Sequence, residues 1–159
     1  NYEKNNLCFA VRNTDINPDN IKIKVSAPKN ALFYNMKTFE KIKTDYSEGM
    51  HTFDLYLLGR ETGVIKAVNP NSINKFKIGM AKRQLENLSE LIDPDALWAQ
   101  EEDSVKLRKI IGEKFTETLK DKDLKDFCET GLKKIEGITG RNREEAEYIL
   151  RNTLNYLNM

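Results

Sequence analysis

Hydrophobic and polar residues alternate with a period of two in the first part of this chain, and with a period near 3.6 in the rest. The change falls at Asn69-Pro70-Asn71-Ser72. A period of two is typical of strands with one buried face, whereas a period near 3.6 is typical of amphipathic helices. The pattern therefore predicts an α+β fold with a strand-rich N-terminal part and a helical C-terminal part.

The strand-rich part consists of short apolar segments that are separated by turn residues. Its clearest alternation is Ile21-Lys22-Ile23-Lys24-Val25, in which every second residue is a lysine. The expected strands cover residues 7–11, 21–25, 31–36, 52–58 and 64–68. About five short strands with no helix between them predict an antiparallel sheet or a small sandwich. Residues 37–48 fit either a strand or a helical turn.

The helical part contains apolar stripes for a bundle of about four to five helices. We expect the first helix over residues 73–92, with Ser72 as its N-cap, and a second helix that starts at Asp93-Pro94. Further stripes cover residues 107–119, 124–135 and 146–157. Gly131 lies inside one of these stripes and predicts a close helix crossing, and Asn142 is expected to cap the last helix.

The change of period divides the chain into two predicted subdomains, residues 1–69 and residues 70–159, which we expect to share one core. The 159 residues suffice for one ordinary domain or two small ones. No run of about eighteen apolar residues occurs, so no transmembrane helix is predicted. Because the sequence begins with Asn1 rather than Met, we expect it to be processed or to be part of a longer protein.

Acidic and basic residues almost cancel, with 25 Asp and Glu against 26 Lys and Arg. A net charge of +1 gives no long-range attraction to nucleic acid or to an anionic membrane, so either partner would need a local basic patch. The two cysteines are Cys8 and Cys128. We expect two buried thiols in an intracellular reducing compartment, with a disulfide between them as the alternative.

Signatures of catalysis are scarce in this sequence. The single histidine, His51, has no metal-binding spacing to a second histidine or a cysteine, and the common phosphate-loop and nucleophile motifs are absent. Acidic clusters at 101–103 and 144–145 suit helix starts, where they complement the helix dipole, so no metal or cofactor is predicted. The alternative is an enzyme whose site gathers around His51, Glu48 and Asp54 in a deep pocket.

The segment 132–150 contains a glycine turn, Gly137-Ile138-Thr139-Gly140, which leads into the last expected helix. It resembles the helix-hairpin-helix family of nucleic-acid-binding motifs, whose turn and following helix present backbone amides to a phosphate. The resemblance implies nucleic-acid contacts at Gly137, Gly140, Arg141 and Arg143. Thr139 stands where the family has its second glycine. The alternative is a structural helix hairpin, which needs the same glycine stop.

The expected first helix is the second candidate surface for nucleic acid. It carries the basic residues Lys75, Lys77, Lys82 and Arg83. If these residues and the two arginines of the glycine turn form one connected surface, binding to nucleic acid should weaken steeply with salt. The alternative is an ordinary solvated helix face.

The absence of catalytic signatures favours a non-enzymatic interaction or assembly domain, which binds a protein partner or itself as viral and phage structural proteins do. Trp98, Tyr148 and Tyr156 are the expected interface residues, because such side chains combine a large apolar surface with a polar group. The alternative role of these three residues is core packing. The first alternative function is nucleic-acid binding, and the second is the enzyme around His51.

Overall fold

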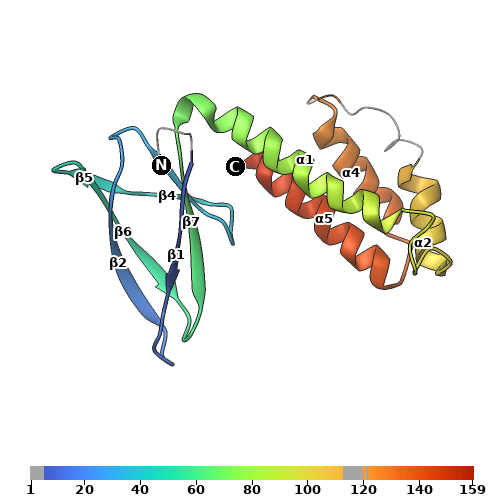
Figure 1. The fold of residues 1–159 in the computed structure, drawn as a ribbon, viewed down its shortest axis with the longest axis horizontal. Helices are drawn as coiled ribbons and strands as arrows, with labels where there is room; N and C mark the ends of the chain where they lie inside the picture. Colours follow the sequence, from blue (N-terminus) through green and yellow to red (C-terminus); the bar gives the residue numbers. More distant parts are fainter. Residues whose placement is uncertain (1–5, 113–119, 121) are drawn as a thin grey trace. The chain divides into compact units, whose positions relative to one another are not determined.

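The computed structural model describes residues 6–112, 120 and 122–159 (Figure 1). The chain has an α+β fold, in which two antiparallel sheets are followed by helices, as the hydrophobic pattern predicts. The residues form two compact units, Asn1–Phe76 with Met159 and Lys77–Asn158. No helix in the described part of the chain has the length and apolar character needed to cross a membrane.

The first unit is a small sandwich. Its strands are β1 (Asn6–Arg12), β2 (Asp19–Ser26), β3 (Leu32–Asn35), β4 (Lys41–Ile42), β5 (Asp45–Ser47), β6 (Met50–Leu57) and β7 (Thr62–Val68). They form one sheet in the order β1-β7-β3-β4 and a second in the order β2-β6-β5. The ambiguous residues 37–48 thus contribute two very short strands and no helix.

Apolar side chains from both sheets meet in one core between them. Phe33 and Ile65 come from the first sheet, and Phe53 and Leu55 come from the second. The alternation along each strand produces this arrangement, because successive side chains of a strand point to opposite faces. The expected strand positions are therefore confirmed, and the sandwich is the correct alternative.

The helices are α1 (Ile73–Leu91), α2 (Glu102–Leu107), α4 (Leu124–Ile135) and α5 (Arg141–Asn158), with a 3₁₀ turn η2 (Pro70–Ser72) and a π-helical turn η3 (Arg108–Gly112). The predicted close crossing at Gly131 is confirmed. A Cβ atom at Gly131 would lie 3.2 Å from Cδ1 of Leu150 on α5. Glycine therefore lets α4 approach α5 closely.

The start of α1 at Ile73 is confirmed, but its predicted N-cap is wrong. Ser72 lies inside η2, whose cap is Asn69, and the Asn69 side-chain oxygen accepts from the Asn71 amide at 2.9 Å. Asp93-Pro94 does not start a helix. The Asp93 carboxylate accepts a hydrogen bond from the Asp95 amide at 2.9 Å, as an N-cap would, but residues 94–100 continue as turns and a bend and not as a helix. Of the stripe expected over residues 107–119, Phe115 and Leu119 lie outside the described residues.

The expectation of two buried thiols is correct for Cys128 and wrong for Cys8. Cys128 is buried within α4, whereas Cys8 is exposed on β1, and both thiols are free. The reason is the alternation in β1. Its larger residues Leu7, Phe9 and Val11 pack against the sandwich core, which leaves the Cys8 side chain on the outer face.

We predict that only Cys8 reacts with an alkylating reagent in the native protein. Burial raises the pKa of the Cys128 thiol to about 12, although a hydrogen bond with Thr153 partly opposes this shift. At neutral pH the thiolate fraction of Cys128 is therefore about a thousandfold below that of an ordinary cysteine. Mass spectrometry after brief labelling should find one modified thiol in native protein and two in urea. Equal native labelling of both cysteines would contradict the burial of Cys128.

Candidate functional site

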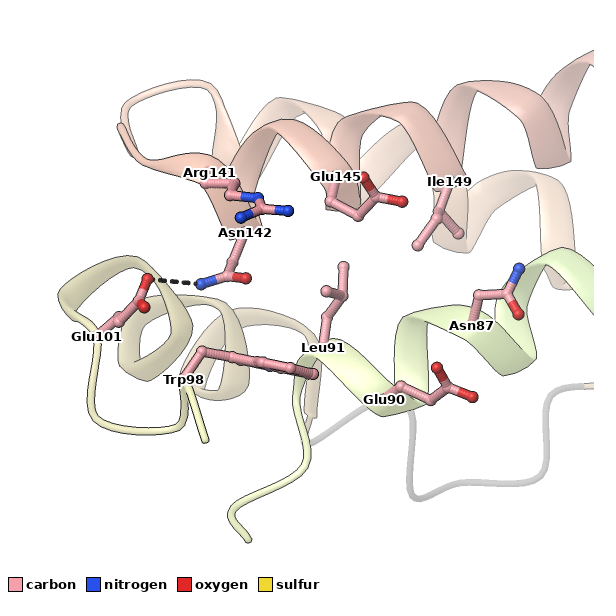
Figure 2. A pocket seen from close by; sticks show the side chains of 9 residues that line it. All are labelled: Asn87, Glu90, Leu91, Trp98, Glu101, Arg141, Asn142, Glu145 and Ile149. Atoms are coloured by element: carbon pink, nitrogen blue, oxygen red, sulfur yellow. Dashed lines mark hydrogen bonds between the residues drawn. The ribbon is translucent and has the colours of Figure 1, made fainter. Parts of the chain in front are cut away.

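The unit Lys77–Asn158 contains a pocket of about 520 Å³. It is lined by Asn87, Glu90 and Leu91 of α1, by Trp98 and Glu101 of the following turns, and by Arg141, Asn142, Glu145 and Ile149 of α5. Figure 2 shows Leu91 and Ile149 pointing toward each other between the two helices, with the Trp98 ring beside Leu91. The size lies within the range of small-molecule sites.

The pocket combines an apolar wall with a charged rim. Three carboxylates and the guanidinium of Arg141 surround the opening, and all four of these side chains belong to exposed residues. Glu101 Oε2 accepts a hydrogen bond from the Asn142 side chain at 2.9 Å (Figure 2). The indole nitrogen of Trp98 is buried and has no hydrogen-bond partner among the described residues. This composition suits binding of a group to the rim, and it contains neither a nucleophile nor a histidine.

A buried carboxylate lies next to this pocket and caps α5. Asp103 is 4% exposed. Its Oδ2 accepts hydrogen bonds from the backbone amides of Asn142 at 2.8 Å and of Arg143 at 3.1 Å. Asn142 is therefore not the N-cap that the sequence predicts, because it donates its amide to a residue of α2. The cap comes from a residue 39 positions away, which a local sequence pattern cannot show.

The carboxylate of Asp103 is held in its ionised form. Burial alone would raise the pKa of Asp103, but hydrogen bonds from the Arg143 amide, from the Asn142 side chain and amide, and from the Ser104 amide together lower that pKa below its ordinary value. A negative charge at the start of α5 also complements the helix dipole. The ionised acid thus joins α2 to the first turn of α5.

The same contacts explain the glycine turn that resembles the helix-hairpin-helix motif. Gly140 has a φ of +141°, and a Cβ atom there would lie 2.3 Å from Oδ2 of Asp103. Only glycine leaves room for the carboxylate. The amides of Asn142 and Arg143, which a phosphate would need, already donate to Asp103. These contacts are those of a structural hairpin, the alternative interpretation of this turn.

The basic residues proposed for nucleic-acid binding do not form a one-sided stripe. Successive residues of a helix are rotated by about 100° around its axis. On α1, Lys82 therefore points about 140° away from Lys77 in one direction, and Arg83 points about 120° away from Lys77 in the opposite direction. Lys75 belongs to the first unit, and the other three belong to the second. In the glycine turn, Arg143 pairs with Glu147 and donates to the Ile135 carbonyl, whereas Arg141 lines the pocket.

His51 is a buried core histidine with both ring nitrogens in hydrogen bonds. Its Nε2 lies 2.9 Å from the Pro28 carbonyl oxygen, which can only accept, so Nε2 carries the proton. Nδ1 lies 2.9 Å from the Thr44 hydroxyl and accepts from it. His51 does line a pocket of about 360 Å³. However, Glu48 and Asp54 are exposed and do not line this pocket, so the expected acid–base group does not assemble there.

The three expected interface residues lie in different environments. Tyr148 is exposed on the surface of α5, with 61% of its area accessible. Tyr156 belongs to the core, where burial raises the pKa of its hydroxyl. Trp98 forms a wall of the pocket. These residues therefore do not share one surface that a partner could cover.

The free edge of β1 is a further candidate, which sequence reasoning missed. Among the strands of the described residues, β1 ends its sheet in the strand order and pairs only with β7 (Figure 1). The Asn13 amide donates to the Glu61 carbonyl at 2.9 Å and continues the β1–β7 register. In an antiparallel ladder, every second residue of a strand forms its backbone hydrogen bonds with the same neighbouring strand. Counting back from Asn13 in steps of two, Leu7, Phe9 and Val11 therefore direct their backbone groups to β7.

The backbone N–H and C=O groups of Cys8 and Ala10 consequently face the open edge of the sheet. An independent bond agrees with this assignment. The Met36 amide donates to the Val64 carbonyl at 2.8 Å, which places the alternate residues of β7 in the ladder with β3. Each residue of β7 can serve only one neighbouring strand, so its other residues serve β1.

Among the described strands, the other edges carry the usual protection against pairing. β2 exposes Lys22 and Lys24, whereas β4 has two residues and β5 has three. Between Leu7 and Val11, β1 has no charged residue, proline or glycine. Charges, prolines and short lengths are the features that prevent edge strands from pairing with other chains. β1 lacks all of them over five consecutive residues.

Comparisons with known protein families, with curated proteins and with solved structures found no match to this chain. The function is therefore inferred from the geometry of the described residues.

We predict that Gly140→Ala destabilises the second unit by about 2 kcal/mol or more, because it adds backbone strain and displaces the Asp103 cap. Trp98 is the single tryptophan, so its fluorescence in urea follows this unit. Gly137→Ala is the matched control, because a Cβ atom at Gly137 would meet nothing within 4 Å. In a double variant with Asp103→Ala the two costs should not add, because both changes remove the same contact. Full additivity would contradict the proposed role of Gly140.

We predict that Asp103→Asn lowers the free energy of unfolding at pH 7 by about 2 kcal/mol, because the amide cannot accept all the hydrogen bonds of the carboxylate. The pKa of Asp103 is lower in the folded state than in the unfolded state. The ionised carboxylate therefore stabilises the fold fully above the unfolded pKa of about 3.9, and this stabilisation is lost as pH falls through the folded pKa. The difference in the free energy of unfolding between wild type and Asp103→Asn should therefore become smaller below about pH 4. Urea unfolding at pH 7 and pH 3 measures this. A constant difference would argue against an ionised cap.

Proposed function

We propose that the chain is an interaction domain whose sandwich accepts an extended segment of another polypeptide as an additional strand along β1. The observation that supports this proposal is the outward direction of the backbone groups of Cys8 and Ala10 in an edge strand without a charged residue between Leu7 and Val11. Strand addition uses such groups directly, since main-chain hydrogen bonds supply affinity and alternate side chains supply specificity.

The side chains of β1 define the chemistry of the bound segment. Leu7, Phe9 and Val11 pack against the sandwich core but remain only partly buried. A neighbouring strand with large apolar residues at every second position would cover their exposed sides. On the outer face, Cys8 and Ala10 are small and leave room for either small or polar residues. The favoured partner is therefore an extended segment in which large apolar residues alternate with small or polar ones.

His51 and the first turn of α5, the sites of the two alternative functions, already have partners within the chain. Both nitrogens of His51 are hydrogen-bonded, and the first amides of α5 donate to Asp103. Catalysis at His51 or phosphate binding at α5 would have to break these contacts first. Strand addition at β1 breaks no hydrogen bond of the described residues, which is why the geometry favours it over the two alternatives.

A synthetic peptide with the β1 sequence, Asn6–Arg12, tests the proposal, with serine at the cysteine position to prevent oxidation. Its binding can be followed by fluorescence polarisation. We expect wild type to bind the peptide and Ala10→Pro to bind it at least about tenfold more weakly, because proline removes an edge-facing N–H worth about 1 kcal/mol and adds strain. A peptide of the same composition without the alternation should bind more weakly than the β1 peptide.

Ala10→Thr is the matched control, because threonine keeps the N–H and favours strands. Ala10 does not donate to β7, so the proline variant should keep the sandwich folded, which circular dichroism and the melting temperature check. Equal binding to wild type and to a folded Ala10→Pro variant would rule out the β1 edge as the binding site. Absence of binding to wild type at concentrations where the chain is monomeric would also contradict the proposal.

A further inference from the structure

We infer that the strand added to β1 is β1 of a second copy of this chain, in antiparallel pairing across a two-fold axis at Phe9. This inference rests on the proposed function and identifies the partner. A two-fold interface requires that one surface be complementary to itself. The sequence and the edge of β1 meet this condition in three respects.

The first respect is the order of side-chain sizes along the strand. Around Phe9, β1 reads the same in both directions, with one small residue and then one large apolar residue on each side. Antiparallel pairing about Phe9 therefore opposes Leu7 to Val11, Cys8 to Ala10, and Phe9 to its own copy. Large residues meet large residues on the inner face, and small residues meet small residues on the outer face. Aromatic and β-branched pairs of this kind stabilise antiparallel strands.

The second respect is the direction of the backbone groups. Cys8 and Ala10 both face the open edge, so opposing them gives a hydrogen-bonded pair in which each residue donates and accepts. Phe9 directs its own backbone groups to β7, and it therefore occupies the non-hydrogen-bonded position between two such pairs. In this position the side chains of opposed residues approach most closely, which suits a contact between the two phenyl rings.

The third respect is length and charge. Pairing about Phe9 engages the whole of Asn6–Arg12 in both copies, whereas a two-fold axis at Cys8 or Ala10 leaves part of each strand unpaired. It also places the two Arg12 residues at opposite ends of the paired strands. The pairing therefore does not oppose like charges across the two strands. Opposed like charges would weaken the pairing.

The oligomeric state of the purified chain tests the inference. Sedimentation velocity over a range of concentrations should show a monomer–dimer equilibrium for wild type and for Ala10→Thr. For Ala10→Pro the dissociation constant should rise at least about tenfold, because each dimer loses the same edge-facing N–H twice. A wild-type monomer at all concentrations, or a dimer that persists in folded Ala10→Pro, would overturn the inference.

A thiol introduced at position 10 tests the register. In pairing about Phe9, Cys8 lies opposite position 10 of the other copy, with a Cα–Cα distance of about 5.5 Å, which a disulfide can span. Ala10→Cys should therefore form a covalent dimer under mild oxidation. Wild type should not, because its two Cys8 residues are offset by about two residues, or 7 Å, along the strands. The double variant Cys8→Ser with Ala10→Cys should not either. A wild-type dimer linked through Cys8 would overturn this register.

The two experiments separate this inference from the proposed function. If wild type is monomeric but binds the β1 peptide, and Ala10→Pro does not, then the edge accepts strands and the second-copy assignment is wrong. If wild type neither self-associates nor binds the peptide, both the inference and the proposed function are wrong.

Discussion

A backbone N–H or C=O group that leaves water must find a hydrogen-bond partner within the protein, and this requirement governs both units of the chain. In the second unit it explains why a charged residue, Asp103, is buried. The first turn of α5 has amides without partners in its own helix, and the carboxylate supplies acceptors for two of them. In the first unit the same requirement is met on one side of β1 by β7, while the other side of β1 remains open among the described strands.

The contacts of Asp103 and the open edge of β1 show how this requirement distinguishes groups with a structural role from groups that are available to a partner. Burying a carboxylate is costly, and the cost is offset only when its oxygens accept several hydrogen bonds. Asp103 accepts from the amides of Ser104, Asn142 and Arg143, and these contacts leave little capacity for an external ligand. In the described residues no group of three or more metal-binding side chains surrounds it. A site that is satisfied internally has a structural role, whereas open groups at an exposed edge are available to a partner.

The strands and most helices could be predicted from sequence because periodicity is a local property. The alternation of Ile21 to Val25 and the stripe around Gly131 both lie in one continuous segment, and both predictions are confirmed. The failures have non-local causes. Nothing near Asn142 indicates that its amide donates to Asp103, and nothing in residues 7–11 indicates that their strand lies at an edge. At Asp93 the capping bond that Asp-Pro predicts is present, but the residues after it continue as turns and not as a helix.

An edge strand without protective charges is normally a risk for uncontrolled association, so the open edge of β1 needs an explanation. Pairing of β1 with β1 of a second copy supplies one. Each chain has a single β1, and a two-fold pair uses both open edges at once, so growth stops at two chains. The two sheets of order β1-β7-β3-β4 then join into one, whose outer edges are both β4. A strand of two residues offers too few backbone groups to add another strand. A closed dimer thus requires a β1 edge that can pair and a β4 edge that is too short to pair. An open fibril would instead require a β4 edge long enough to pair with another strand.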